Sequence, residues 1–351
     1  MDESQRTFLD DLLTTASPSG FETPATRVWV DYVSTFADEV TVDPYGNAVA
    51  TVEGPGDASV AFGGHADEIG FIVRDVDDDG FLSLSRIGGS DRTVTRGQHV
   101  TVHADDPVHG VVGQTAIHVR EDDGDGPPDV ENQYVDIGAT SREEAVERVE
   151  VGDPVTFSSG VQDLLGTRLA GRGVDNRVGV WAAAEGLRRA SERGTDATVH
   201  AVATIQEEVG YEGARMVGVD LDVDAFVAVD VTHATDAPGA PTDRTSPVSL
   251  GDGPVVARGS TNHPGLVDGV RETAAGEGID VQLQAAGSST GTDADAMFTV
   301  GGPTPSLNLG VPNRYMHTPV EVVDTRDLDE LADLLGAVGT RVEGYDLGPG
   351  F

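Results

Sequence analysis

The stretch SVAFGGH, residues 59–65, decides the fold of this chain. A short apolar run bounded by turn residues is typical of a buried core strand, and we expect this strand at Ser59 to Gly63, with Gly64 and His65 at its carboxyl end. Open α/β sheets bind their ligands beyond the carboxyl ends of the strands. The stretch therefore predicts a core strand and, at its end, the position of a site.

Strands and helices alternate on both sides of this run. Before it we expect helices at Ser4 to Thr15 and Glu22 to Phe36, then strands at Val40 to Val42 and Ala48 to Val52. After Gly166 the expected elements are a helix at Asp175 to Ser191, strands at Thr198 to Ile205 and Ala225 to Val231, a helix at His263 to Ala275, strands near Val281 and at Ser306 to Leu309, and a helix at Asp327 to Val342. This alternation predicts an α/β fold: a mostly parallel sheet with helices on both faces.

Residues 75–165 have a different texture. The expected strands here are short and separated by Gly- and Asp-rich turns: Phe81 to Arg86, His99 to Val102, Gly110 to His118 and Pro154 to Ser158. Such a pattern fits a small β barrel or sandwich. We expect a β barrel, inserted into a catalytic domain formed by residues 1–74 and 166–351. The acidic stretch 121–129 is expected to be a solvated hairpin tip.

The chain is strongly acidic. Its 351 residues include 61 acidic and 22 basic side chains, a formal net charge of -39, and every basic residue is arginine. This charge excludes a general affinity for nucleic acid phosphate. Dispersed acids without lysine are typical of proteins adapted to molar salt, where screening removes their repulsion. We therefore expect a protein of a halophile cytosol.

The absence of cysteine and of long apolar segments excludes further classes of protein. The chain has no cysteine, which excludes disulfides, thiolate zinc sites and a cysteine nucleophile. The first residues, Met1 to Asp11, are charged and lack a signal-peptide core. No stretch approaches the ~18 consecutive apolar residues of a membrane span. We expect a cytoplasmic protein that does not bind membranes.

Carboxylates and imidazoles stand at the ends of several expected elements. They are His65, Asp175, the pair Glu207 and Glu208, Asp230, and His317. Oxygen and imidazole ligands without sulfur suit divalent ions such as zinc, cobalt or manganese. Two ions in a hydrolytic site lie ~3.5 to 4 Å apart, which requires one carboxylate to bridge them. The joint pattern predicts a site for two metal ions.

The stretches around these residues resemble the tetrahedral aminopeptidase family of metallopeptidases, family M42. The resemblance rests on GHADEIGF (64–71), VDNR (174–177), QEEVG (206–210), VDVTHA (229–234) and RYMHTP (314–319), and on GG (88–89), DIGA (136–139) and GTDA (291–294). These motifs span nearly the whole chain, including the inserted region. The resemblance implies the zinc-peptidase type of α/β fold.

The resemblance also implies the metal ligands. Asp175 would bridge two ions, with His65 and Asp230 completing one site and Glu208 and His317 the other. Glu207 would be the general base. The position of Glu207 next to Glu208 supports giving the two glutamates different roles. Two neighbouring carboxylates in an extended segment do not easily face one ion, so one stays free to accept a proton.

Several further residues are of interest because they lie next to these motif residues in the sequence. Asp67, two residues beyond His65, is expected to accept a hydrogen bond from that imidazole and fix its tautomer. Enzymes that the chain resembles hold the peptide bond before Asn176 in the cis form. A direct role for His233 is not expected, and Thr292 and Asp293 are expected near the site.

The implied function is removal of amino-terminal residues from short peptides. The resemblance also implies a homo-oligomer, a dodecamer in which the inserted domain makes subunit contacts. A related di-metal deacylase or carboxypeptidase is an alternative, with Arg314 or Arg177 holding a substrate carboxylate. An endoglucanase-type glycoside hydrolase is more distant, since sugar clefts offer aromatic faces and only 5% of these residues are aromatic.

Overall fold

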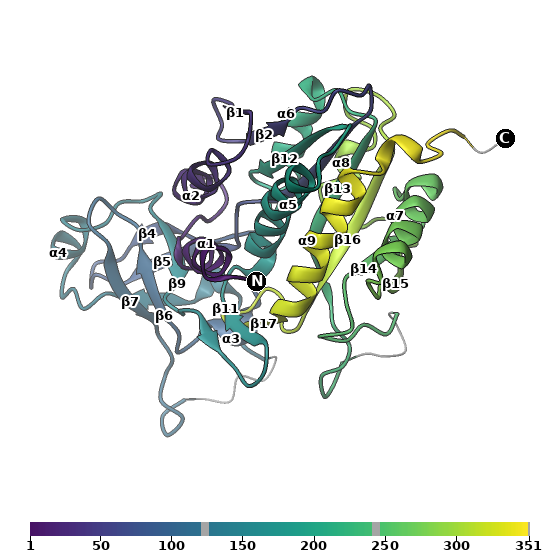
Figure 1. Cartoon of the computed structure of the whole chain (residues 1–351). Helices are drawn as coiled ribbons and strands as arrows, with labels where there is room; N and C mark the ends of the chain where they lie inside the picture. Colours follow the sequence, from purple (N-terminus) through teal and green to yellow (C-terminus); the bar gives the residue numbers. More distant parts are fainter. Residues whose placement is uncertain (121–125, 241–245, 350–351) are drawn as a thin grey trace.

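The computed structural model describes residues 1–120, 126–240 and 246–349. Its largest element is an eight-stranded sheet with the order β1-β2-β12-β3-β13-β16-β14-β15 (Figure 1). The strands are β1 (Glu39–Val42), β2 (Ala48–Val52), β3 (Ser59–His65), β12 (Thr198–Thr204), β13 (Ala225–His233), β14 (Val255–Arg258), β15 (Gln282–Ala285) and β16 (Ser306–Asn313). The central strands β12, β3, β13 and β16 are parallel, and β2 and β14 pair antiparallel with them. The carboxyl ends of the central strands therefore meet at one edge.

Helices cover both faces of this sheet. One face carries α1 (Glu3–Thr14), α2 (Thr23–Val33), α5 (Val174–Arg193), α7 (Pro264–Glu277) and α9 (Thr325–Gly339), and the other carries α6 (Glu212–Asp220) and α8 (Ala294–Met297). Strand β3 supplies both cores because its side chains alternate. Val60 and Phe62 join the larger core, and Ala61 joins the smaller one. The predicted α/β fold with helices on both faces is confirmed.

Glycines bring α5 directly onto β3. A Cβ atom on Gly64 would lie 2.6 Å from the carbonyl carbon of Gly179, which leaves no room for a side chain. The helix and the strand therefore touch backbone to backbone. This contact brings Asp175, near the start of α5, beside His65 at the end of β3.

Two indole groups dock the amino-terminal helices onto α5. The Trp29 Nε1 of α2 donates to the carbonyl of Val180 at 2.9 Å, and the Trp181 Nε1 of α5 donates to the carbonyl of Gln5 at 3.0 Å. Both indoles are fully buried. Because each buried N–H has its acceptor, burial of these large rings is favourable.

A closed six-stranded barrel with its own core stands beside the sheet (Figure 1). Its strands, in spatial order, are β4 (Gly70–Val76), β5 (Leu82–Ile87), β8 (Tyr134–Asp136), β7 (Val108–Val112), β6 (His99–Val102) and β9 (Pro154–Phe157), accompanied by α3 (Arg92–Thr95), η1 (Val130–Asn132) and α4 (Arg142–Val146). The expected barrel is thus confirmed. The tip of the expected acidic hairpin, 121–125, lies outside the described residues.

A small sheet connects segments that border the site. It consists of β10 (Gln162–Asp163), β11 (Arg168–Gly171) and β17 (Glu321–Asp324), with η2 (Val342–Gly344) later in the chain. Through β11 and β17 it joins the segment that precedes α5 to the segment that follows β16. Among the described residues, no helix combines the length and the apolar character needed to cross a lipid bilayer.

Candidate metal centre

The carboxyl edge of the sheet gathers the residues that the sequence singled out. They come from β3, α5, the loop after β12, β13 and the loop after β16: His65, Asp175, Glu207, Glu208, Asp230 and His317. All of these side chains line one cavity of about 680 Å³. The ends of parallel strands, together with the start of α5, bring six residues from distant parts of the chain into one place.

The Asp175 carboxylate lies between the two imidazoles. Its Oδ1 is 3.2 Å from Nε2 of His65, and its Oδ2 is 3.3 Å from Nε2 of His317. Each carboxylate oxygen therefore faces a different histidine. Burial acts to raise the pKa of Asp175, but hydrogen bonds with His317 and His65 outweigh it and hold that pKa below its usual range.

The deep half of the site consists of His65, Asp230 and Glu207. The Nε2 of His65 is 3.7 Å from Oδ1 of Asp230 and 3.8 Å from Oε2 of Glu207. These three residues offer ligand atoms that lie within 4.8 Å of one another, as do His65, Asp175 and Glu208. Glu207, the expected base, is thus as close to His65 as the expected ligand Asp230 is.

The open half of the site consists of His317 and Glu208. The Nε2 of His317 is 3.5 Å from Oε1 of Glu208, and that buried oxygen has no hydrogen-bond partner among the described residues. The ring of His317 is held from behind, since its Nδ1 lies 3.1 Å from the carbonyl oxygen of Gly89 beside the barrel. The His317 side chain is 33% exposed, against 2% for His65.

The site holds more carboxyl groups than basic groups. Burial raises the pKa of Glu207 to about 10 and that of Glu208 to about 8. A hydrogen bond with Asp175 raises the pKa of His317 to about 9. Among the described residues that line the cavity there is no arginine. Buried carboxylates of this density need cations to remain ionised.

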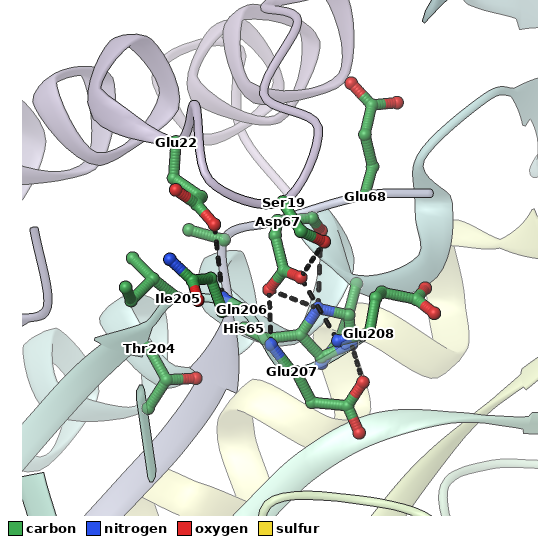
Figure 2. Close-up of polar contacts among 12 residues, drawn as sticks. Ser19, Glu22, His65, Asp67, Glu68, Thr204, Ile205, Gln206, Glu207 and Glu208 are labelled. Carbon is green, nitrogen blue, oxygen red and sulfur yellow. Dashed lines mark hydrogen bonds and ion pairs between the residues drawn. The ribbon is translucent and has the colours of Figure 1, made fainter. Parts of the chain in front are cut away.

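Two carboxylates hold the backbone of residues 206–208, as Figure 2 shows. The carboxylate of Asp67 accepts the N–H groups of Glu207 at 3.1 Å and Glu208 at 3.2 Å, and it also lies 3.3 Å from Nδ1 of His65. The carboxylate of Glu22 accepts the N–H of Gln206 at 3.1 Å. Three consecutive amides are therefore fixed by acids, which sets the directions of the Glu207 and Glu208 side chains.

Sequence reasoning missed two of the acids that hold the site. Glu22 follows a glycine turn and also accepts the N–H of Gly20 at 2.7 Å. Glu321, at the start of β17, accepts the N–H of Asp175 at 2.8 Å. Both are almost fully buried. The available signal was an acid two residues after a turn glycine for Glu22 and an acid opening an apolar strand for Glu321, and neither is specific in so acidic a chain.

Comparison with known proteins gives the family. The family described as M42 glutamyl aminopeptidase matches residues 46–334. The chain belongs to the M42 peptidase family. This confirms the family expected from the motifs, and with it an enzyme that hydrolyses peptide bonds.

Relatives match nearly the whole of this M42 chain. It is 33% identical to a lysyl aminopeptidase of Pyrococcus furiosus over 94% of this chain and 95% of that protein. The solved TET aminopeptidase of the marine sediment archaeon Thaumarchaeota archaeon SCGC AB-539-E09 is 30% identical, with a TM-score of 0.91 over 97% of this chain and 99% of that one. The Pyrococcus horikoshii TET1 peptidase, which can assemble into a tetrahedron or a large octahedral shell, is 29% identical, with a TM-score of 0.86 over 95% and 99%.

The remaining expected residues of this M42 chain fall at different distances from the cavity. Thr292 and His233 line it, and Asp293 is buried behind it, where it accepts a hydrogen bond from Thr204. The peptide bond between Asp175 and Asn176 is cis.

Neither arginine that a carboxypeptidase would need lies in the lining. Arg177 is fully buried and pairs with Glu68 at 3.1 Å. Arg314 pairs with Asp236 at 2.7 Å. Both guanidinium groups are therefore engaged away from the cavity.

Proposed function

We propose that this chain removes amino-terminal residues from short peptides with two divalent metal ions, zinc, cobalt or manganese. The observation that carries the proposal is the position of the Asp175 carboxylate, with one oxygen toward His65 and the other toward His317. A carboxylate shared between two imidazoles, with a further acid on each side, is the donor arrangement that a two-ion hydrolytic site requires.

The donor chemistry of the cavity fits such ions. Oxygen and imidazole donors without sulfur suit these divalent metals, and the buried Glu208 Oε1 lacks a hydrogen-bond partner among the described residues. The proposed ligands are Asp175 as the bridge, His65 and Asp230 in the deep half, and Glu208 and His317 in the open half. Two divalent ions would supply positive charge that balances the ionised carboxylates of the site.

Glu207 is the proposed general base. The ions, when bound, polarise the scissile carbonyl and favour ionisation of the attacking water. Glu207 then accepts the water's proton on a carboxylate oxygen and passes it to the departing amine nitrogen. Asp67 is the proposed positioning residue, since it holds the Glu207 amide and contacts the His65 ring.

The test is release of free amino acids from unblocked peptides and from the same peptides acetylated at the amino terminus. We expect release from the unblocked set alone, loss of release after chelation, and recovery with cobalt, manganese or zinc. Equal cleavage of acetylated peptides would favour the deacylase or carboxypeptidase alternative. Full activity after chelation, with no metal by elemental analysis, would overturn the two-ion proposal.

The assembly is a separate part of the proposal. We infer that the chain forms a homo-oligomer, a dodecamer, in the cytoplasm of a halophile, with residues 75–165 as an inserted domain that makes subunit contacts. The support is the solved TET relative that assembles into a shell and the net charge of -39, which opposes association until salt screens it. Light scattering should show the particle loosening below ~1 M salt, where the screening length exceeds ~3 Å. A particle of unchanged size in dilute buffer would contradict the salt adaptation.

A further inference from the structure

The cavity has a second wall that the metal-centre residues do not form. Four residues from neighbouring strands make up this wall, which we call the recess: Thr232, Ala257, Gln284 and Asn308. They belong to β13, β14, β15 and β16, which lie together at one side of the sheet (Figure 1). In the sheet register, Ala257 pairs with Gln284, and Asp230 pairs with Gly310, two residues beyond Asn308. The recess therefore adjoins the deep half of the metal centre, with Asn308 two residues below the level of Asp230 and Thr232 two residues above it.

Asn308 is the unsatisfied polar group of the recess. Its side chain lines the cavity, yet the residue is only 4% exposed. The buried Oδ1 has no hydrogen-bond partner among the described residues. The backbone N–H of Asn308 donates to Oδ1 of Asn262 at 2.7 Å, which fixes the strand at this point. A buried amide oxygen without a hydrogen-bond partner is suited to a ligand that brings a donor.

The rest of the recess is neutral. Thr232 donates its hydroxyl proton to Oε1 of Gln284 at 2.8 Å, which orients the Gln284 amide. Apart from the six metal-centre residues, the described lining contains no aspartate, glutamate or arginine. A charged side chain that reaches the recess would lose its hydration and find no oppositely charged residue among the four that form it. A purely apolar side chain would leave the Asn308 amide unpaired.

Depth selects among the neutral side chains. Asn308 lies two residues below the level of Asp230 along parallel strands, which corresponds to roughly 6.6 Å at ~3.3 Å per residue. A serine hydroxyl is too short to span this depth from a backbone held at the metal centre. A glutamine side chain is longer, and its amide offers two donors and an acceptor to the Asn308 amide.

We propose that the recess binds the side chain of the substrate's amino-terminal residue and that Asn308 makes the enzyme selective for a neutral amide, glutamine above all. This inference rests on the proposed aminopeptidase function and names the substrate class of the same site. Asn308 is a specificity residue here, and it takes no part in the bond-breaking step.

The first experiment compares substrates on the natural chain loaded with cobalt in molar salt. The probes are the p-nitroanilides of glutamine, leucine, lysine and glutamate, each with a free amine. We expect kcat/KM for the glutamine substrate to exceed that for leucine by roughly tenfold or more, because glutamine, unlike leucine, can donate to the Oδ1 of Asn308. The lysine and glutamate substrates should be cleaved less well than glutamine.

The second experiment changes the recess itself. Asn308→Asp keeps the shape and replaces the amide by a carboxylate, so the ratio of lysine to glutamine cleavage should rise by about tenfold or more. Asn132→Asp, at the exposed last residue of η1 beside the barrel, adds the same charge outside the cavity and should leave the ratio as in the natural chain. Ratios within one preparation are unaffected by the fraction of folded enzyme.

The outcomes separate the two levels of the proposal. No release from any of the four substrates, or from free peptides, would overturn the proposed function itself. Release that favours leucine, lysine or glutamate over glutamine would overturn the selectivity alone. If Asn308→Asp does not fold, the substrate order of the natural chain still decides. If it folds with an unchanged ratio, Asn308 does not contact the substrate.

Discussion

The deep and open halves of the metal centre have similar donors but different supports. His65 ends a core strand and is almost fully buried, and the Asp67 carboxylate lies against its Nδ1. His317 stands in a loop after β16 with a left-handed φ of 63°, and its Nδ1 meets the backbone carbonyl of Gly89. One imidazole is thus positioned by the sheet, and the other by a contact between two loops.

This difference indicates where the site is most easily changed. Core strands have the highest local stability, whereas loops open at much lower cost. Perturbations of the deep half should therefore appear as losses of stability or of both ions. Perturbations of the open half should appear as weaker occupancy of one ion in a protein that is otherwise folded.

The largest effect is expected where the halves meet. Asp175→Asn removes a charge shared by His65 and His317, so both ions should be lost, with a fall in kcat/KM of roughly 10³-fold or more, since the ions supply several kcal/mol. Elemental analysis beside turnover measures this. Retention of one full ion equivalent would show that the halves bind independently and that Asp175 does not bridge.

The next effect separates two adjacent glutamates. Glu207→Gln keeps its volume and should retain both ions while losing roughly 10² to 10⁴ in rate, because it can no longer accept a proton. Glu208→Gln should lose metal as well as activity, and mainly from the open half. An active Glu207→Gln, or one that loses an ion, would mean that the two roles are exchanged.

A third effect concerns the support of the deep half. Burial raises the pKa of Glu22 from 4.5 to about 7, so the unfolded chain ionises this group first. The unfolding free energy should therefore fall, by up to about 3 kcal/mol, as pH rises from about 4.5 to about 7. Glu22→Gln should show a smaller fall than the natural chain, since Asp327, whose pKa burial raises to about 6, still titrates in this range, and it should resist denaturant better than the natural chain above pH 7.

The control for Glu22 is Glu39→Gln, an exposed glutamate at the start of β1. It should preserve the pH dependence of the natural chain in the same denaturant titrations. Identical pH slopes for the natural chain and Glu22→Gln would mean that Glu22 is already ionised in the folded state at low pH.

The smallest effect tests the open half alone. A Cβ atom on Gly89 would lie 2.8 Å from Nδ1 of His317, so Gly89→Ala should push the imidazole aside. Displacing a group that orients a metal ligand costs about 10- to 100-fold in metal affinity or activity. Metal titration should show one site weakened and the other unchanged. Equal weakening of both would indicate that the open half is not separately supported.

The core of the fold could be predicted because its strands are nearly continuous apolar runs. The boundaries expected for residues 48–52 are those of β2, and the strand expected at residues 59–63 is β3, which continues to His65. Strands and helices whose sequences mix polar with apolar residues were harder to predict. The strand β4 was not expected, since its polar Arg74 and Asp75 interrupt the pattern, and the strand expected at Gly110 to His118 ends at Val112. The helix α6 was missed because glycines and acids obscure its period.

The candidate site, like the fold, could be predicted in part from the sequence. The six cavity residues were found because each stands at an element end within a motif, and the structure brings all six together. Glu22 and Glu321 could not be found in this way. They act by accepting backbone N–H groups from segments 184 and 146 residues away, and such pairings depend on tertiary contacts that local pattern does not contain.

The seam between α5 and the first two helices has an optical consequence. The chain contains 2 tryptophans, and both place their indole N–H on a backbone carbonyl across that seam. Intrinsic tryptophan fluorescence therefore reports on this seam and does not detect changes in the barrel. Undocking of α1 and α2 would expose both indoles to water and shift their emission to the red, while melting of the barrel by itself would leave the emission unchanged.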